Sequence, residues 1–535
     1  MQESLRSRFE TADGARAECL DRARFCASLT KPWILPPDGW TESQKLPETY
    51  SSLAARGVTN LEGRLLLAIF PPPGQPWFKL KPAGTMKFDP SIDPAMIQEF
   101  QKGLHLQELM ILAQLEKVNL ESGKNGRRAG FRSRMRLALS QLLITGDVLM
   151  HLSDDFDIRV FRRDHYCTKR NPAGDVMYHL TREQIDPLTL PEKFLLEAEM
   201  SQDDLAAKRC DDRLVDLYTM VEWNPLKKNW VITQEMNGFI INELTEKITP
   251  YMSVTYALPP AADYGRGLVE ENLGDVRSMN ELTERILDFA AIASKQLFCL
   301  DYNSQVRPQD LAAPTGSVIQ ARVQNGQISD IGMLRADKLT DFNVVSTTRE
   351  HIRRDLATTM LMEAETTPTG ERVTAYQVQR VAMELEGALG GLYAPIADSM
   401  QMPLVERVRH VLVRKGLLVD LPNEAVEIHA VTGVQALANE NDQAKIMQLL
   451  QTIAQLGPET MARLDTGVLL DLLMRQSGIY EPGLVKSQET IEEEQAQARQ
   501  QEFEMMASQQ AVQTGGKVVE QQMAMNATPP EQMNV

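Results

Sequence analysis

The sequence lacks the short motifs that mark the commonest catalytic sites. It contains no G-x-x-x-x-G-K-S/T phosphate loop, no G-x-S-x-G nucleophile elbow and no H-E-x-x-H zinc helix. Its five cysteines are widely spaced and form no C-x-x-C pair, which argues against a zinc ribbon or a disulfide framework and favours reduced thiols in a cytosolic setting. The motif search therefore predicts no catalytic residue, no metal site and no cofactor.

Long apolar runs are also missing. The best candidate, residues 137–152, is interrupted by Asp147 and is shorter than the roughly 18 to 20 residues that a membrane-spanning helix needs. The start of the chain is charged and has no apolar signal core. We therefore expect a soluble protein without a secretory signal and without a membrane partner.

Positive charge is scarce. The 535 residues include 56 Lys and Arg against 73 Asp and Glu, a net charge of −17. Proteins that bind duplex DNA tightly present a basic surface to the phosphates, so this balance argues against such a binder. An arginine-rich run over residues 126–136 is a local exception, and an exposed or interface-facing helix start explains it more simply than nucleic-acid binding does.

What is present is ordinary globular composition, with 43% apolar and 24% charged residues, enough for about three to five domains. In the first half, apolar periodicity and turn signals predict an α+β region with an antiparallel sheet over residues 1–260. The expected helices are 2–29, 53–70, 91–119 and one that begins in the arginine-rich run and continues through 137–144. The expected strands are 148–152, 158–161, 176–180, 214–221, 230–234 and 239–241.

The second half reads differently and is mainly helical. A long apolar stripe predicts one helix over 268–297, whose stripe either joins the core of the same chain, the commoner case, or packs on another subunit. A small β-containing insert follows at 300–340, then a helix at 341–362. Pro368 and Gly370 make 363–372 a loop.

The rest of the chain is predicted from its breakers and its composition. A very long helix is expected from 373 to about 416, kinked or broken at Gly390, Gly391, Pro395 and Pro403. Residues 432–475 are expected to be helical. After residue 487 the chain is rich in Gln and Met and is predicted to be partly flexible. The fold class is therefore α+β, mainly helical.

Several stretches, in order, resemble one family. From about residue 20 to about 485 the chain resembles the portal, or head-to-tail connector, proteins of short-tailed, podovirus-type bacteriophages. The residues Thr369-Gly-Glu-Arg-Val-Thr-Ala375 match the family motif at every position. The other matching stretches are 55–61 with 67–71 and Trp77, 141–152, 264–266 with 273–279, 384–386, 389–391 and 403–405.

The resemblance implies an elongated subunit in a ring, usually of twelve copies, at one capsid vertex of the virion. Double-stranded DNA passes through its channel during packaging and ejection, without sequence specificity. The implied partners are the terminase motor, scaffolding and major capsid proteins, a tail adaptor protein and internal core proteins, met first in the host cytoplasm during assembly. The implied parts are an antiparallel β wing (1–263), stem helix 1 (264–299), a clip (300–340), stem helix 2 (341–362), a tunnel loop (363–372), a long wing helix (373–422), a helical crown (423–486) and a tail (487–535).

The resemblance also implies which residues face DNA. These are five residues of the loop, and three arginines of the second stem helix that would lie near DNA or a neighbouring subunit: Thr366, Thr367, Thr369, Glu371, Arg372, Arg349, Arg353 and Arg354. Relatives often carry a basic residue just before the Thr-Gly-Glu-Arg motif, whereas this chain has Pro368. The alternative for the loop is a plain connection between helices, and for the arginines it is solvated charge on a helix.

Two other functions remain open from the sequence. One is a metal-dependent nuclease without a recognisable motif, built on Asp154, Asp155 and Asp157, although such a cluster is more often a solvated loop after a strand. The other is a non-enzymatic helical scaffold or adaptor that forms no closed ring. A nuclease needs a divalent metal and those three carboxylates, whereas a portal cuts nothing and forms rings.

Overall fold

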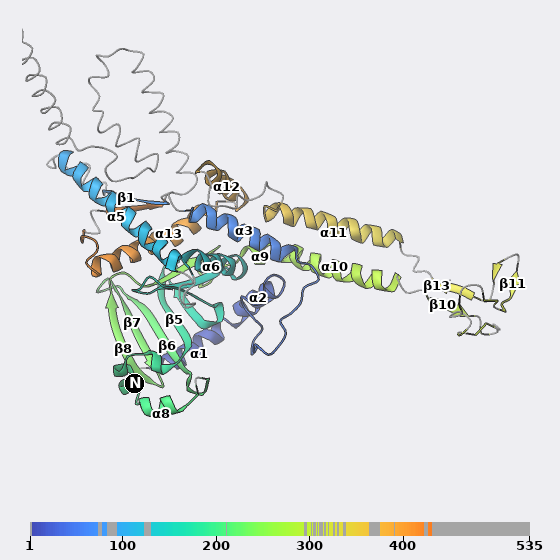
Figure 1. Cartoon of the computed structure of the whole chain (residues 1–535), viewed down its shortest axis with the longest axis horizontal. Helices are drawn as coiled ribbons and strands as arrows, with labels where there is room; N and C mark the ends of the chain where they lie inside the picture. Colours follow the sequence, from blue (N-terminus) through green and yellow to red (C-terminus); the bar gives the residue numbers. More distant parts are fainter. Residues whose placement is uncertain are drawn as a thin grey trace, which may run out of the picture. The chain divides into compact units, whose positions relative to one another are not determined.

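The computed structural model describes residues 3–72, 77–82, 94–121, 130–293 except 210, 297–334 in part, 339–362, 375–421 except 390, and 426–430 (Figure 1). All of them belong to the first of two units into which the chain divides, residues 1–437. The segments 363–374 and 431–535, which include the expected tunnel loop, most of the expected crown and the whole tail, lie outside the described residues.

Two helices form the centre of the main core. Helix α3 (Leu53–Ile69) is rich in Leu and Ala and ends at Phe70, directly before a run of three prolines that cannot continue a helix. Helix α6 (Phe131–Thr145) ends at Gly146, which adopts the left-handed conformation (φ 81°) that favours glycine. Both helices bury most of their apolar side chains in one continuous core, so their predictions from periodicity are confirmed.

Two antiparallel sheets follow α6. Leu149 and Tyr251 of the smaller sheet share a core cluster with Val221 and Ile232 of the larger one. Apart from the bulge between Gln234 and Glu235 and that in the β4–β5 pair, the larger sheet is a regular meander. The smaller sheet has the order β3 (Ile158–Phe161), β2 (Asp147–Leu152), β9 (Tyr251–Thr255), and the larger has the order β4 (Tyr166–Arg170), β5 (Val176–Ile185), β6 (Val215–Asn224), β7 (Asn229–Met236), β8 (Phe239–Glu246).

The predicted N-terminal helix over 2–29 is two helices, α1 (Leu5–Ala15) and α2 (Ala17–Ser28), so the single helix was wrong. The chain breaks at Arg16, whose buried guanidinium donates hydrogen bonds to backbone oxygens of the sheet region, including that of Arg163 at 2.8 Å. The short elements between the strands are η2 (Arg163–His165), η3 (Pro187–Thr189), α7 (Glu192–Glu197), α8 (Gln202–Ala207) and η4 (Asp211–Arg213).

The stripe at 268–297 is not one helix either. It forms α9 (Leu268–Glu271) and α10 (Leu273–Ala293), and strand β10 (Leu297–Leu300) begins where the helix was expected to end. The expected β-containing insert is confirmed by β10, β11 (Val323–Gln324), β12 (Gln327–Ile328) and β13 (Ile331–Leu334), which form two antiparallel pairs. The helix expected at 341–362 is α11 (Leu339–Thr359).

The long helix expected from 373 is interrupted, as predicted, at the glycine pair. Helices α12 (Ala375–Ala388) and α13 (Tyr393–Arg414) are separated by a turn in which Gly391 has φ 86°. The chain stays helical through Pro403, so of the kink or break expected there the break does not occur. Pro395 lies in the first turn of α13, where proline is tolerated.

One sheet joins residues that are very far apart in the sequence. Strand β1 (Phe78–Pro82) pairs antiparallel with β14 (Val426–Ala430), with Leu80 opposite Ile428. Residues 426–430 were expected to be part of a helical crown, so for them that expectation is wrong. Helix α5 (Pro94–Glu121) contacts β1. Within the described residues, no helix is both long and apolar enough to cross a membrane.

Candidate functional site: the helix pair α10–α11 and its anchors

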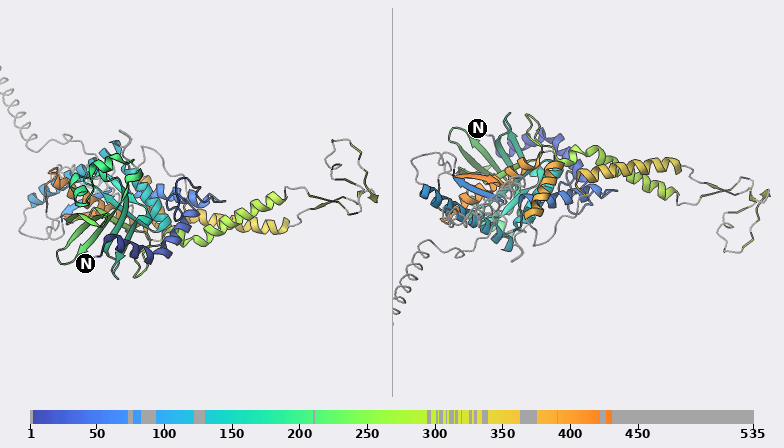
Figure 2. Two further views of the ribbon diagram at one scale, coloured as in Figure 1. Left: turned by 90° about the horizontal axis from the view of Figure 1, so that it is seen from below. Right: turned by 90° about the horizontal axis from the view of Figure 1, so that it is seen from above.

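Helices α10 and α11 lie side by side in all views (Figures 1 and 2). Near one end of the pair the rings of Phe289 and Phe342 stack with centroids 5.0 Å apart. At the other end Val276 and Leu356 are buried in the main core. Part of the apolar stripe is therefore core of the same chain, the commoner of the two expected uses.

The outer part of the pair keeps apolar side chains on its surface. Leu287 of α10 is 53% exposed and Val344 of α11 is 63% exposed. Isolated exposed leucines are common in proteins, but here they share a two-helix element with a stacked aromatic pair. This outer part therefore has apolar surface that another helix pair can cover.

The three arginines expected to face DNA lie on α11. The Glu350 carboxylate forms an ion pair with Arg353 at 2.8 Å and lies 3.4 Å from the Arg354 guanidinium. The two arginines follow Glu350 by three and four residues, so all three side chains share one helix face. The hydrogen bond from Arg353 lowers the pKa of the Glu350 carboxyl. Arg349 lies one turn before Arg353 and is only half-buried. The arginine charge on this face is thus partly compensated within the helix.

The five loop residues expected to face DNA lie outside the described residues: Thr366, Thr367, Thr369, Glu371 and Arg372. Their roles therefore stay predictions. What it does describe are the two flanks of the loop, Met362 after α11 and Ala375 at the start of α12.

A close crossing of three glycines holds the segment that leads into α9 and α10. A Cβ atom on Gly146 would lie 2.6 Å from the Gly265 carbonyl oxygen, and one on Gly267 would lie 2.7 Å from the Leu143 carbonyl oxygen. The backbone N–H of Gly265 donates to the Asp147 carboxylate at 2.9 Å. The turn after α6 and the entry to α9 thus touch backbone to backbone, and side chains larger than hydrogen do not fit between them.

Asp147 is a buried carboxylate at this crossing. Burial raises its pKa to about 6, although the nearby guanidinium groups of Arg163 and Arg170 oppose the shift. The Arg163 Nε lies 3.8 Å from Asp147, and its guanidinium stacks over the Tyr264 ring at 4.0 Å. Asp147 therefore contributes a titrating group to the anchor of the helix pair.

Replacing Asp147 by asparagine is expected to change how stability depends on pH. Because the folded-state pKa lies above the ordinary 3.8, the stabilisation is complete below about pH 3.8 and is lost as the pH rises through about 6. The Asn amide oxygen can still accept the Gly265 N–H. The unfolding free energy of the original chain minus that of Asp147→Asn should fall by about 2 kcal/mol between pH 4 and pH 7. Denaturation of both proteins across this range measures the difference, and parallel curves would contradict it.

The acidic cluster does not form a metal site in the part of the chain described here. Asp154 pairs with Arg407 at 3.0 Å and also contacts Arg414, while Asp155 approaches Lys415 at 3.7 Å. The Asp157 carbonyl accepts a turn hydrogen bond from the backbone N–H of Ser153 at 3.0 Å. Among the described residues, no three acidic, His or Cys groups are placed to hold a metal ion. The nuclease hypothesis gains no support, and the turn after a strand explains the cluster.

Sequence reasoning missed the glycine crossing and the role of Asp147. The signals were present, because Asp147 interrupts an apolar run and follows a glycine, but they did not indicate which backbone would approach that glycine. Gly265 and Gly267 lie about 120 residues later, and no local pattern links them to Gly146.

Comparison with known proteins gives one family. Residues 2–485 match the family model described as bacteriophage head to tail connecting protein. The chain is 28% identical to the portal protein of Escherichia phage T7, covering 99% of this chain and 96% of that protein. It is 29% identical to the portal protein of Enterobacteria phage T3, covering 82% and 79%. A chain from the neck of an empty GTA particle is 12% identical with a TM-score of 0.39, covering 74% of this chain and 86% of that chain. The family match includes every described element.

Proposed function

This chain belongs to the family of bacteriophage head to tail connecting proteins, and from this premise we propose that α10 and α11 form the stem of a ring. The protein is a structural portal at the capsid vertex of a virion. The observation that supports the stem assignment is the helix pair itself, buried in the core at one end and carrying exposed Leu287 and Val344 toward the other.

The remaining parts follow from the order of elements. Residues 1–263 form the wing, 300–340 the clip that meets the packaging motor and later the tail adaptor, and 363–372 the tunnel loop. The first stem helix ends at Ala293, and the crown begins after β14, because β14 pairs with β1. Scaffolding, major capsid and internal core proteins are further partners, and the host cytoplasm is where assembly takes place.

Charge suits a channel that lets DNA slide. Duplex DNA carries about one charge per 1.7 Å of axis, and each charge-assisted contact to a phosphate stabilises by roughly 1.5–3 kcal/mol. A densely basic lining would therefore hold DNA at every step. The chain has a net charge of −17, and two of the α11 arginines share Glu350. A few arginines whose charge is partly neutralised by Glu350 would centre the duplex without binding it tightly.

Ring formation tests the proposal most directly. Twelve copies of the 60.1 kDa chain give a particle of about 721 kDa. Light scattering on the purified protein, with negative-stain images of the same peak, should show this mass and a central hole. A monomer or dimer at all protein and salt concentrations would contradict the ring and would favour the scaffold or adaptor alternative.

Ring assembly should increase with salt concentration. Twelve subunits carry twelve times −17 charges, and their mutual repulsion extends about 30 Å at 0.01 M salt but only about 8 Å at 0.15 M. We expect a larger ring fraction at 0.15 M than at 0.01 M in light scattering at constant protein concentration. A ring fraction that does not change over this range would show that net repulsion does not limit assembly.

A further inference from the structure

Helix α3 contacts α11 of the proposed stem and both described helices that follow it, α12 and α13. Gly57, Asn60 and Arg64 are spaced i, i+3 and i+7, so they lie on one face of α3. This face contacts the end of α11 and the side of α12. At the C-terminal end of α3, the hydroxyl of Tyr393 in α13 donates to the Ala68 carbonyl oxygen at 3.2 Å.

Asn60 caps the C-terminus of α11. Its side-chain amide donates to the carbonyl oxygens of Met360 at 3.0 Å and Leu361 at 2.9 Å, two groups that have no partner inside a helix that is ending. Leu361 has φ 52°, in the left-handed region that is unfavourable for a non-glycine residue. A Cβ at Gly57 would collide with the Met360 side chain, which therefore packs directly against this face of α3.

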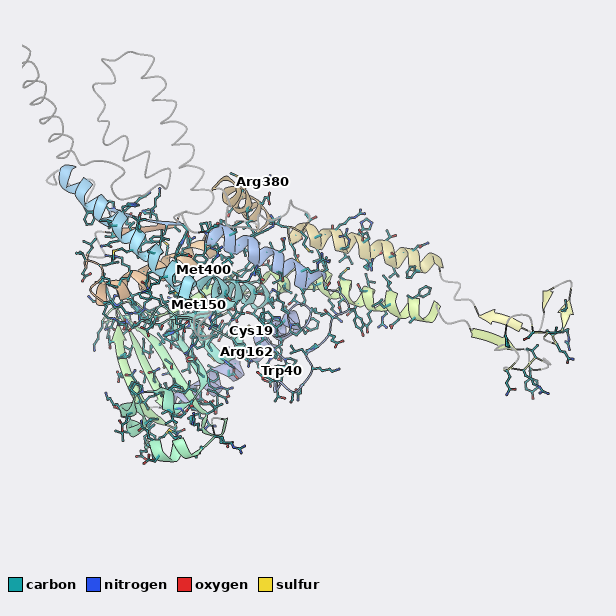
Figure 3. All side chains as sticks on the ribbon, in the orientation of Figure 1. Cys19, Trp40, Met150, Arg162, Arg380 and Met400 are labelled. Carbon is teal, nitrogen blue, oxygen red and sulfur yellow. The ribbon has the colours of Figure 1, made fainter. Side chains whose placement is uncertain are left out.

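Arg64 holds α12. Its side chain is almost completely buried, and its guanidinium donates to Glu384 at 2.7 Å. Arg380, labelled in Figure 3, also approaches Glu384, at 3.3 Å, but its own side chain is 53% exposed. Arg380 lies on α12 itself, at the (i, i+4) spacing from Glu384, so Arg64 and not Arg380 attaches α12 to α3.

We propose that Asn60 and Arg64 are positioning residues for DNA passage, because they fix both described flanks of the connection between α11 and α12 to one buried helix. The connection spans residues 363–374 and includes the loop that the proposed function places in the channel, so this inference rests on that function. Neither residue touches DNA in this scheme. Each acts by lowering how often a flank of the connection opens, since local opening is governed by the contacts that hold each segment.

Proteolysis of purified full-length rings tests the anchoring. Trypsin cleavage after Arg372 is followed in Asn60→Ala and Arg64→Met, with Arg380→Ala as the matched control, because it removes the exposed partner of the same Glu384. We expect cleavage about tenfold faster in the first two variants, equivalent to about 1.4 kcal/mol of lost anchoring, and about unchanged in the control. Rates equal to the original in rings of unchanged mass would overturn the anchoring.

A second readout separates positioning from plain structural support. Particles are assembled with each variant as the sole connector, and their DNA content is compared at equal ring number and equal thermal midpoint. We expect several-fold fewer DNA-filled particles for Asn60→Ala and Arg64→Met than for Arg380→Ala, with Arg64→Lys partly restoring the number. If Arg64→Met forms no rings, Asn60→Ala, which removes hydrogen bonds but no charge, decides the question.

The outcomes distinguish failure of the proposed function from failure of the positioning role of Asn60 and Arg64. If the original chain forms no rings or supports no DNA-filled particles, the proposed function fails. If the original chain does both and the two α3 variants match it in cleavage rate and DNA content, the function stands and the positioning role of Asn60 and Arg64 is wrong.

Discussion

Replacing Gly146 by alanine is expected to destabilise the protein by about 3–5 kcal/mol, among the largest effects of any single methyl group in this chain. At φ 81° a side chain costs roughly 1–2 kcal/mol by itself. The new Cβ would also lie 2.6 Å from backbone atoms of Gly265 and Arg266, which cannot move aside like the end of a flexible side chain. Thermal unfolding and soluble yield measure the effect.

Gly274→Ala is the matched control for this prediction. Gly274 lies in the first turn of α10, and a Cβ there would meet nothing within 4 Å. Alanine is a better helix former than glycine, so this variant should be neutral or slightly more stable. If both variants unfold at the same midpoint, the crossing at Gly146 does not hold the entry to α9 in the way described.

The elements that the sequence predicted well are those whose information is local. Helices α3 and α6 show a clear apolar period of 3.6 and end at proline or glycine, and both were predicted nearly to their ends. Strand β6 alternates next to a turn signal and was also found. A helix or strand with such a pattern buries one face wherever it packs, so its existence does not depend on knowing its partner.

The elements that failed depend on distant partners or on short apolar runs. Strands β1 and β14 have five residues each and are separated by more than 340 positions, so neither is stable or recognisable without the other. The expected helix ran to residue 297, which is the first residue of β10, because a short apolar run fits a helix and a strand equally well.

In the candidate site too, features set by local sequence were predicted and features set by distant partners were not. Its charged residues were found on α11, but the sharing of Arg353 and Arg354 by Glu350 follows from a rotamer choice that the sequence does not specify. The anchoring of α11 by Asn60 joins positions about 300 residues apart. Family resemblance found the stretch that contains Asn60 but assigned it no role, because resemblance shows that a residue recurs and not what it touches.

Replacing Arg407 by methionine is the second change with a large expected effect, about 3 kcal/mol of lost stability. Arg407 on α13 is buried and donates to Glu246 of β8 at 2.8 Å and to Asp154, in the turn after β2, at 3.0 Å. Methionine fills a similar volume but leaves these acceptors with weaker partners. Removing one member of a buried charge pair typically costs about 3–5 kcal/mol, and Arg414 keeps part of the compensation here.

Arg414→Ala tests whether burial sets the size of this effect. Arg414 contacts the same two acidic residues, but its side chain is 41% exposed, so its loss should cost less than about 1 kcal/mol and should shrink further at high salt. Denaturant unfolding of both variants at 0.05 M and 1 M salt makes the comparison. Equal losses would mean that the network is a surface feature. A large, salt-insensitive loss for Arg407→Met alone would mean that Asp154 has a structural role, because Arg407 joins α13 to the two sheets through Asp154 and Glu246.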